Sequence, residues 1–209
     1  MIFVYLVHSL SKKSMSTATL TPTRVLPTDL KTVAEFEQWQ QQSGNDGNFE
    51  FVQGRIIPKS MKQIEVLLGN FLILRFIQTK AFQQGDIIMA ESDSYVDATR
   101  KRIPDLTYFS ENQLEAIRRN ERVNALFAIE ILSDSEAHQD VLDKITERGP
   151  QDYFDGGAQL VWYIAPKRQK IYAHTSPEEL TVFKGPQTIT AAPVIPDFQF
   201  VVADLFASA

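Results

Sequence analysis

Three acidic residues lie inside apolar, strand-like segments of the chain. Glu50 lies within FEFV, Asp105 follows a proline in RIPDLTYF, and Glu130 lies within FAIEIL. An isolated ionised carboxylate in an apolar strand is costly, so each of these acids needs solvent, a cationic partner or a metal ion. If they converge to about 5 Å, each pair repels by roughly 3 kcal/mol at an effective dielectric constant near 20. A divalent cation offsets this repulsion, so convergence would indicate a metal site.

Each acid also has an explanation that involves no chemistry. Asp105 could begin a strand with its side chain in water, and Glu130 could be a surface residue or an ion-pair partner. Alternation along FEFV would by itself place Glu50 on an exposed face. The spacing of 25 residues between Asp105 and Glu130, with each acid on one of two neighbouring predicted strands, favours a shared site.

Helices and strands are predicted in mixed order around these acids. Thr32 and Glu35 form a capping-box pattern that begins a helix, and Gln53-Gly54 predicts a two-residue hairpin turn. Apolar residues at spacings of three and four predict one long helix over 62–82, and they are Ile64, Leu67, Leu68, Phe71, Leu74 and Ile77. A polar helix is predicted over 110–121 and another helix after Glu136. Strands are predicted over 86–90, 94–96, 102–109, 125–132, 160–164, 169–174 and 180–183. This order predicts an α/β or α+β domain built on one mixed sheet.

The composition is that of a folded protein with no overall attraction to nucleic acid. The chain has 209 residues, of which 44% are hydrophobic, and a net charge of -5. We expect a flexible tail over 1–27 and a single domain over 28–209. The absence of cysteine excludes a disulfide framework and fits a cytoplasmic protein. The apolar run at 2–7 is too short to span a membrane, so we expect no membrane association.

Several ordered segments carry a resemblance to a known family. FEFVQGRII at 49–57, IPDLTYF at 103–109, AIEILSDS at 128–135 and YFDGGAQLVWYIAP at 153–166 resemble the Uma-two family of predicted restriction endonucleases, which belongs to the PD-(D/E)XK nuclease superfamily. The resemblance covers about residues 26–206. It implies a restriction-endonuclease-like fold, a mixed central sheet flanked by helices, and a cytoplasmic, metal-dependent DNA endonuclease. It also implies Mg²⁺ or Mn²⁺ as the cofactor and a homodimer as one form to test.

The resemblance assigns roles to individual residues. Asp105 matches the aspartate of the PD half of the motif, and Glu130 matches the acid of the second half. These two carboxylates, with the backbone carbonyl of Ile131, would hold the metal ion. Lys144, on the helix after Glu130, would orient the attacking water and stabilise charge in the transition state. Glu50 would complete the acidic cluster.

The chain departs from the family pattern near the predicted lysine. The simplest superfamily pattern has a lysine two residues after the second acid, where this chain has Leu132. Gly149-Pro150 should break the helix that carries Lys144, so Arg148 is an alternative for the same role.

The basic run nearest to Asp105 in the sequence is Arg100-Lys101-Arg102, which would bind DNA phosphates or form a solvated face.

Two other functions remain open for this chain. One is a catalytically degenerate protein that binds nucleic acid or a protein without cleavage, and the other is a homodimeric interaction protein. A second Ile-Pro-Asp triplet, which contains Asp197, is followed by only 12 residues, so we interpret it as a turn into the last strand.

Overall fold

A computed structural model describes residues 26–42, 45, 47–59, 62–132, 145 and 149–207. Its helices are α1 (Val33–Gln40), α2 (Gln63–Phe76), α3 (Lys80–Gln83), α4 (Glu111–Arg118), α6 (Gly149–Asp155) and α7 (Val202–Ala207), with a 3-10 turn at Pro166–Arg168. The strands up to the centre of the chain are β1 (Phe49–Val52), β2 (Arg55–Pro58), β3 (Ile87–Ala90), β4 (Ser94–Asp97), β5 (Arg100–Arg102), β6 (Leu106–Phe109) and β7 (Phe127–Ile131). The later strands are β8 (Leu160–Ala165), β9 (Lys170–His174), β10 (Leu180–Lys184), β11 (Thr188–Ala191) and β12 (Ile195–Val201).

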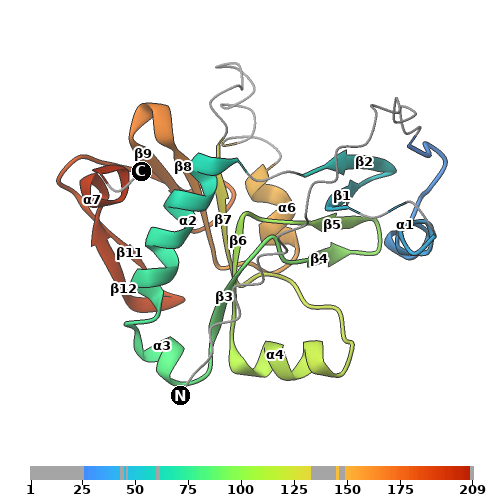
Figure 1. The fold of residues 1–209 in the computed structure, drawn as a ribbon, viewed down its shortest axis with the longest axis horizontal. Coiled ribbons are helices and arrows are strands. Elements are labelled where there is room, and N and C mark those ends of the chain that lie inside the picture. Colours follow the sequence, from blue (N-terminus) through green and yellow to red (C-terminus); the bar gives the residue numbers. More distant parts are fainter. Residues whose placement is uncertain are drawn as a thin grey trace, which may run out of the picture.

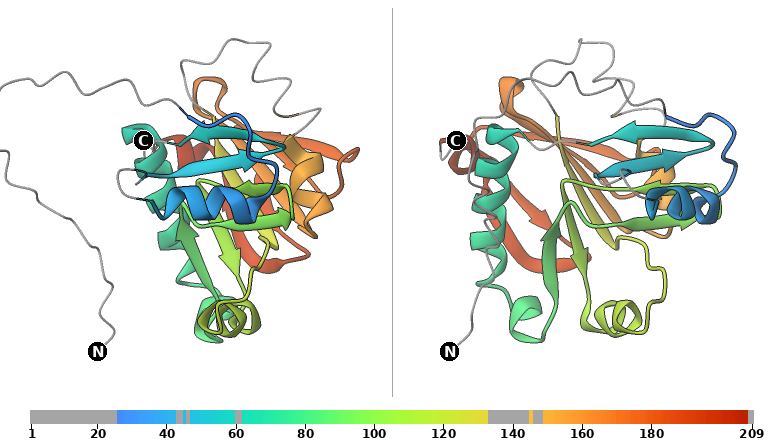
Figure 2. Two further views of the ribbon diagram at one scale, coloured as in Figure 1. Left: turned by 90° about the vertical axis from the view of Figure 1, so that its right-hand side faces the viewer. Right: turned by 45° about the vertical axis from the view of Figure 1, so that its right-hand side comes forward.

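A six-stranded mixed sheet in the order β10-β9-β8-β7-β6-β3 forms the centre of the structure. Helix α2, α7 and the β11-β12 hairpin lie on one side of it, and α6 and a four-stranded sheet in the order β2-β1-β5-β4 lie on the other (Figure 1). Figure 2 shows this smaller sheet and α1 standing apart from the central sheet. The predicted mixed sheet flanked by helices is confirmed, but the first hairpin and residues 94–102 belong to a second sheet.

The two faces of the central sheet are covered by separate apolar clusters. The larger cluster packs α2, α7 and β12 against the face that carries Phe127, Ile129 and Trp162. The smaller cluster lies on the α6 side and contains Ala128 and Tyr153. Alternation along β7 therefore turns its even-numbered residues, Glu130 among them, toward α6.

The local signals at the start of the chain are confirmed. The Thr32 hydroxyl accepts a hydrogen bond of 3.2 Å from the Glu35 backbone N–H, and the Glu35 carboxylate accepts one of 3.1 Å from the Thr32 N–H. These two bonds form the capping box at the start of α1. In the hairpin, Gln53 and Gly54 have φ of 49° and 85°. Two positive φ values are typical of the tight turn that this two-residue loop requires.

The predicted long helix differs from the structure in its length and in its buried face. It stops at Phe76, and α3 follows as a separate turn. Leu68, Leu72 and Phe76 are buried, whereas Leu74 is 60% exposed. Because α2 is apolar on most of its surface, periodicity alone did not decide which side meets the sheet. Leu67 and Ile77 also belong to the apolar pattern that predicted this helix, and each is 42% exposed.

The predicted strand at 102–109 is two strands. β5 ends at Arg102, β6 begins at Leu106, and the residues between them cross from the small sheet to the central sheet. Pro104 lies in this crossing, where its missing N–H costs no ladder hydrogen bond. The second Ile-Pro-Asp triplet lies inside β12 rather than in a turn. The Asp197 carboxylate there accepts a hydrogen bond of 2.8 Å from the Lys80 N–H at the start of α3.

Leu72 and Leu74 provide a matched test of the orientation of α2. Leu72→Ala should lower the free energy of unfolding by about 2 to 5 kcal/mol, because it empties a buried site. Leu74→Ala should change it by less than about 0.5 kcal/mol, because that side chain faces solvent. Urea denaturation measures both values, and equal losses would contradict the observed orientation.

Candidate active site

Asp105 lies at the crossing between the two sheets. It is 5% exposed, and its Oδ2 accepts a hydrogen bond of 2.5 Å from the backbone N–H of Ile131. That N–H points away from β8, and β6 pairs with β7 only as far as Ile129. Beyond the end of the β6–β7 ladder, the Asp105 carboxylate accepts the hydrogen bond that a backbone carbonyl of β6 would otherwise accept. This role accounts for an acid in an apolar segment.

Glu130 lies on the neighbouring strand β7, on the side that faces α6. It is 8% exposed, and its Oε1 accepts a short hydrogen bond from the phenolic hydroxyl of Tyr153 on α6. Tyr153 is itself buried. The rigid ring fixes the direction of one carboxylate oxygen and leaves the other available to a cation.

Lys59 joins the two acids. Its Nζ lies 3.1 Å from Asp105 Oδ1 and 3.0 Å from Glu130 Oε2. Lys59 directly follows β2, and its backbone N–H donates a hydrogen bond of 2.8 Å to the carbonyl of Asn48 at the start of the hairpin. The sequence analysis missed this residue because a lysine in a loop has no characteristic spacing. The only available signal was that buried carboxylates need a cation.

Glu50 lies beside this pair but binds other groups. It is 5% exposed. Its Oε1 accepts a hydrogen bond of 3.0 Å from the Ile103 N–H, and its Oε2 lies 3.5 Å from Nη1 of Arg102. The same Nη1 lies 3.7 Å from Asp152 Oδ2. The structure thus brings Asp105 and Glu130 onto one cation, while Glu50 is held on a second cation at the crossing.

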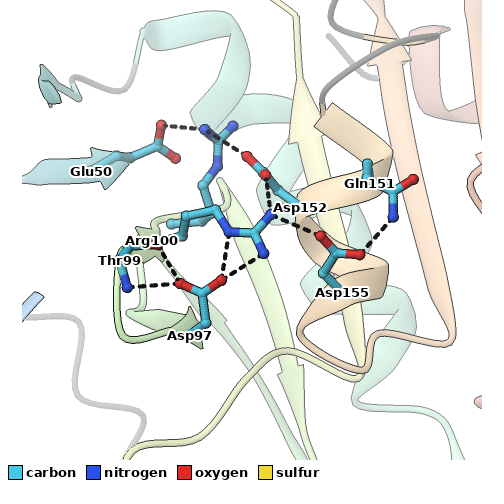
Figure 3. Close-up of polar contacts among 8 residues, drawn as sticks. Glu50, Asp97, Thr99, Arg100, Gln151, Asp152 and Asp155 are labelled. Atoms are coloured by element: carbon cyan, nitrogen blue, oxygen red, sulfur yellow. Dashed lines mark hydrogen bonds and ion pairs between the residues drawn. The ribbon is translucent and has the colours of Figure 1, made fainter. Parts of the chain in front are cut away.

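The predicted DNA-contacting residues Arg100, Lys101 and Arg102 all form ion pairs within the chain. Arg100 contacts Asp152 at 2.8 Å and Asp155 at 2.9 Å, so it links β5 to α6 (Figure 3). It also pairs with Asp97 at 2.6 Å. These pairs already neutralise the guanidinium charge that was predicted to bind phosphate.

Lys101 points to the opposite side of β5. It is 2% exposed, lies 2.9 Å from Asp93 and contacts the Phe36 ring at 5.1 Å from its centroid. The alternation of a strand separates it from its two arginine neighbours. Phosphate binding by this basic run stays a prediction, and at Arg100 and Lys101 it would require these short internal ion pairs to open.

Burial and charge give the paired acids different protonation behaviour. Burial and the nearby charge of Glu130 raise the pKa of Asp105 to about 7, although Lys59 acts in the opposite direction. Burial also acts to raise the pKa of Glu130, but the charges of Lys59 and Arg102 outweigh it and hold that pKa below its usual value. The pKa of Lys59 is raised despite its burial, because Glu130, Asp105 and Glu50 surround it. Lys59 therefore remains an ammonium ion.

The donor set suits a hard divalent cation. Two carboxylates, one from the crossing between the sheets and one from β7, already converge on one cationic atom. Mg²⁺ commonly binds through one or two carboxylates, with water and phosphate as its other ligands. Within the described part of the chain, no group of three or more His, Cys, Asp or Glu side chains is placed to hold a metal ion. Asp105 and Glu130 are thus the described carboxylates that could hold such an ion together.

The basic residue that the sequence predicted for the catalytic lysine role lies outside the described part of the chain. Lys144 and its alternative Arg148 lie outside the described residues, as does most of the helix predicted after Glu136. The backbone of Ile131 does belong to the site, since its N–H binds Asp105. Metal binding by its carbonyl stays a prediction.

Comparison with solved structures identifies the class of fold. The chain resembles a crystal structure titled "putative nuclease belonging to DUF820 from Anabaena variabilis ATCC 29413" with a TM-score of 0.67 and 20% sequence identity. The match covers 84% of this chain and 97% of that chain. The fold is thus a mixed α+β fold shared with that protein, in agreement with the predicted restriction-endonuclease-like architecture.

Comparison with family models identifies the family. The model of the Uma2 family, described as "Putative restriction endonuclease", matches residues 33–203. The chain therefore belongs to the Uma2 family, and the predicted resemblance is confirmed. This family membership supports, at a coarse level, assignment of the chain to the nucleases and therefore a nucleic-acid substrate.

No curated protein matches the chain. Among the described helices, none combines the length and apolar character that a membrane crossing requires.

The pKa of Asp105 predicts a pH-dependent stability. An unfolded aspartate has a pKa of about 3.9, whereas burial and the charge of Glu130 raise the pKa of Asp105 in the folded chain to about 7. Between these two pKa values the folded state binds more protons than the unfolded state. In EDTA, the contribution of Asp105 to the free energy of unfolding should therefore be complete below pH 4 and should be lost as the pH rises through 7. Asp105→Asn should flatten this part of the profile, as measured by urea denaturation at each pH.

The control for this experiment is Asp29→Asn, which removes an exposed carboxylate. It should retain the wild-type decline in unfolding free energy over the same pH range. An unchanged profile in Asp105→Asn would contradict the assignment of the decline to Asp105.

Proposed function

We propose that this protein is a divalent-metal-dependent endonuclease that hydrolyses phosphodiester bonds in DNA. The observation that carries the proposal is the convergence of Asp105 and Glu130 on one cationic position, with distances of 3.1 and 3.0 Å to the same atom. Membership of a family described as "Putative restriction endonuclease" supports this reaction class. Nearly complete burial of both acids supports a cation at this position, because two buried carboxylates this close repel each other.

The proposed cofactor is Mg²⁺, with Mn²⁺ as a substitute, and Asp105 and Glu130 are its proposed ligands. Such an ion supplies Lewis-acid polarisation of the phosphate and a water of lowered pKa. Tyr153 holds Glu130 in a fixed orientation through its hydroxyl. The Ile131 N–H does the same for Asp105. These two hydrogen bonds keep one oxygen of each carboxylate directed at the cation position, which supports preorganised binding.

Arg102 is proposed to balance the charge at the edge of the site. Its side chain is 17% exposed and lies between Glu50 and Asp152 at 3.5 and 3.7 Å. Its Nε is buried and has no hydrogen-bond partner among the described residues. Both ion pairs are long, so the guanidinium has donor capacity left for a phosphate oxygen or a water.

Neutralising either proposed metal ligand should strongly reduce the activity. In Asp105→Asn and Glu130→Gln, cleavage of supercoiled plasmid with Mn²⁺ should fall on the order of 10³-fold. Calorimetric binding of Mn²⁺ should be lost in both variants, because a neutral amide is a weaker ligand for a hard cation than a carboxylate. The same cleavage assay should also be run on single-stranded DNA and on an RNA of the same sequence as that single strand.

Asp197→Asn is the matched control, since Asp197 lies in the second Ile-Pro-Asp triplet and binds the start of α3 instead. It should retain wild-type cleavage and Mn²⁺ affinity. Cleavage of RNA alone would contradict the proposed DNA substrate. DNA binding without cleavage in the wild type would favour the degenerate, non-cleaving function, and full activity of Asp105→Asn would contradict the proposed site.

A further inference from the structure

The ammonium group of Lys59 takes the position where a metal ion would contact both acids. Its Nζ is within 3.1 Å of one oxygen from each carboxylate. Among the ion pairs of the described residues, those of Asp105 and Glu130 are both made with Lys59. A divalent cation bound to the same two oxygens would lie almost on top of this ammonium. Because like charges at that separation repel strongly, the two cations cannot share the position.

Lys59 has a fixed backbone and a side chain that can move. Its N–H is hydrogen-bonded to the Asn48 carbonyl at 2.8 Å, directly after β2. The side chain is 19% exposed, whereas those of Asp105 and Glu130 are 7% and 11% exposed. The ammonium thus reaches the acids from the solvent side, on a flexible four-carbon stem. When displaced, it can move outward while its Cα remains at the mouth of the site.

The mouth of the site is where a phosphate must approach. Asp105 and Glu130 close the inner side of the cation position, because Ile131 and Tyr153 bind their remaining oxygens. Because the other oxygen of each carboxylate faces Lys59, the most exposed of the three side chains, we expect a substrate that shares the ion to approach from the side of Lys59. A displaced ammonium at this place would be next to the anionic oxygens of the phosphate, where a positive charge stabilises charge that develops in the transition state.

We infer that Lys59 is a catalytic residue of this site: in the absence of metal it holds Asp105 and Glu130 together, and on metal binding it moves outward to contact the scissile phosphate. The inference rests on the proposed function. It assigns the lysine role to the loop after the first hairpin rather than to the segment that follows Glu130. It also makes Lys59 a competitor of the metal ion, so one substitution should affect metal binding and cleavage in opposite directions.

Lys59→Met tests both parts of the inference. Calorimetric titration with Mn²⁺ should give at least tenfold tighter binding than in the wild type, because no ammonium has to be displaced. Plasmid cleavage at saturating Mn²⁺ should fall on the order of 10²-fold, because the charge at the phosphate is lost. The midpoint of thermal unfolding should be lower than that of the wild type in EDTA and should rise more on addition of Mn²⁺.

Two further variants make the result specific. Lys59→Gln keeps a hydrogen-bond donor for the acids in case Lys59→Met does not fold, and the same opposite changes are expected. Lys80→Met removes an exposed lysine at the start of α3 and should leave Mn²⁺ affinity and cleavage at wild-type values. It controls for the loss of one positive charge.

The other outcomes contradict different statements. Unchanged or weaker Mn²⁺ binding in both Lys59 variants would overturn the competition between ammonium and metal. Tighter binding with unchanged cleavage would overturn the catalytic role and leave Lys59 as a placeholder only. If neither the wild type nor the variants bind Mn²⁺ or cleave DNA, the proposed function itself fails, and the inference about Lys59 fails with it.

Discussion

Two buried carboxylates on adjacent segments of one sheet repel each other, and the ammonium of Lys59 offsets that repulsion in this protein. The interaction ties the end of the first hairpin, which belongs to the small sheet, to the neighbouring segments β6 and β7 of the central sheet. Lys59 comes from the end of the first hairpin, Asp105 from the crossing between sheets, and Glu130 from β7. An ion pair between buried groups is costly to assemble unless the remaining lone pairs are also satisfied. The Ile131 N–H and the Tyr153 hydroxyl meet that requirement here.

A second set of charges holds the small sheet against α6. Arg100 and Arg102 lie two residues apart on β5, so both side chains point to the same face and both reach Asp152. Lys101 lies between them in sequence and points to the opposite face, where it contacts Phe36. The three residues of β5 thus place positive charges on both faces of the strand, two against α6 and one against α1. The acids of the candidate site depend on this contact indirectly, because α6 also supplies Tyr153.

Features that depend on residues close together in the sequence could be predicted from it. The capping box at Thr32, the turn at Gln53-Gly54 and most strands follow from short patterns, and the structure confirms them. Asp105 and Glu130 were predicted together because each is an acid in an apolar segment, because their segments were predicted to be neighbours, and because the family resemblance assigned both to one motif. Pairing of residues distant in sequence could not be predicted in this way. The buried face of α2 depends on the sheet beneath it, and the ion pairs of Lys59 and Arg100 depend on segments that only the tertiary fold brings near.

The parallel pairing of β7 with β8 has a consequence for the order of folding. Among the strand pairs of the described residues, these two alone run parallel. A parallel pair needs a crossover connection, and α6 belongs to the connection between these strands. The antiparallel hairpins close short loops, whereas this pair must close a long one before it gains any contact. Tyr153 therefore reaches Glu130 only after the crossover has returned to the sheet, so the candidate site should be completed late in folding, on a scaffold of hairpins that has already formed.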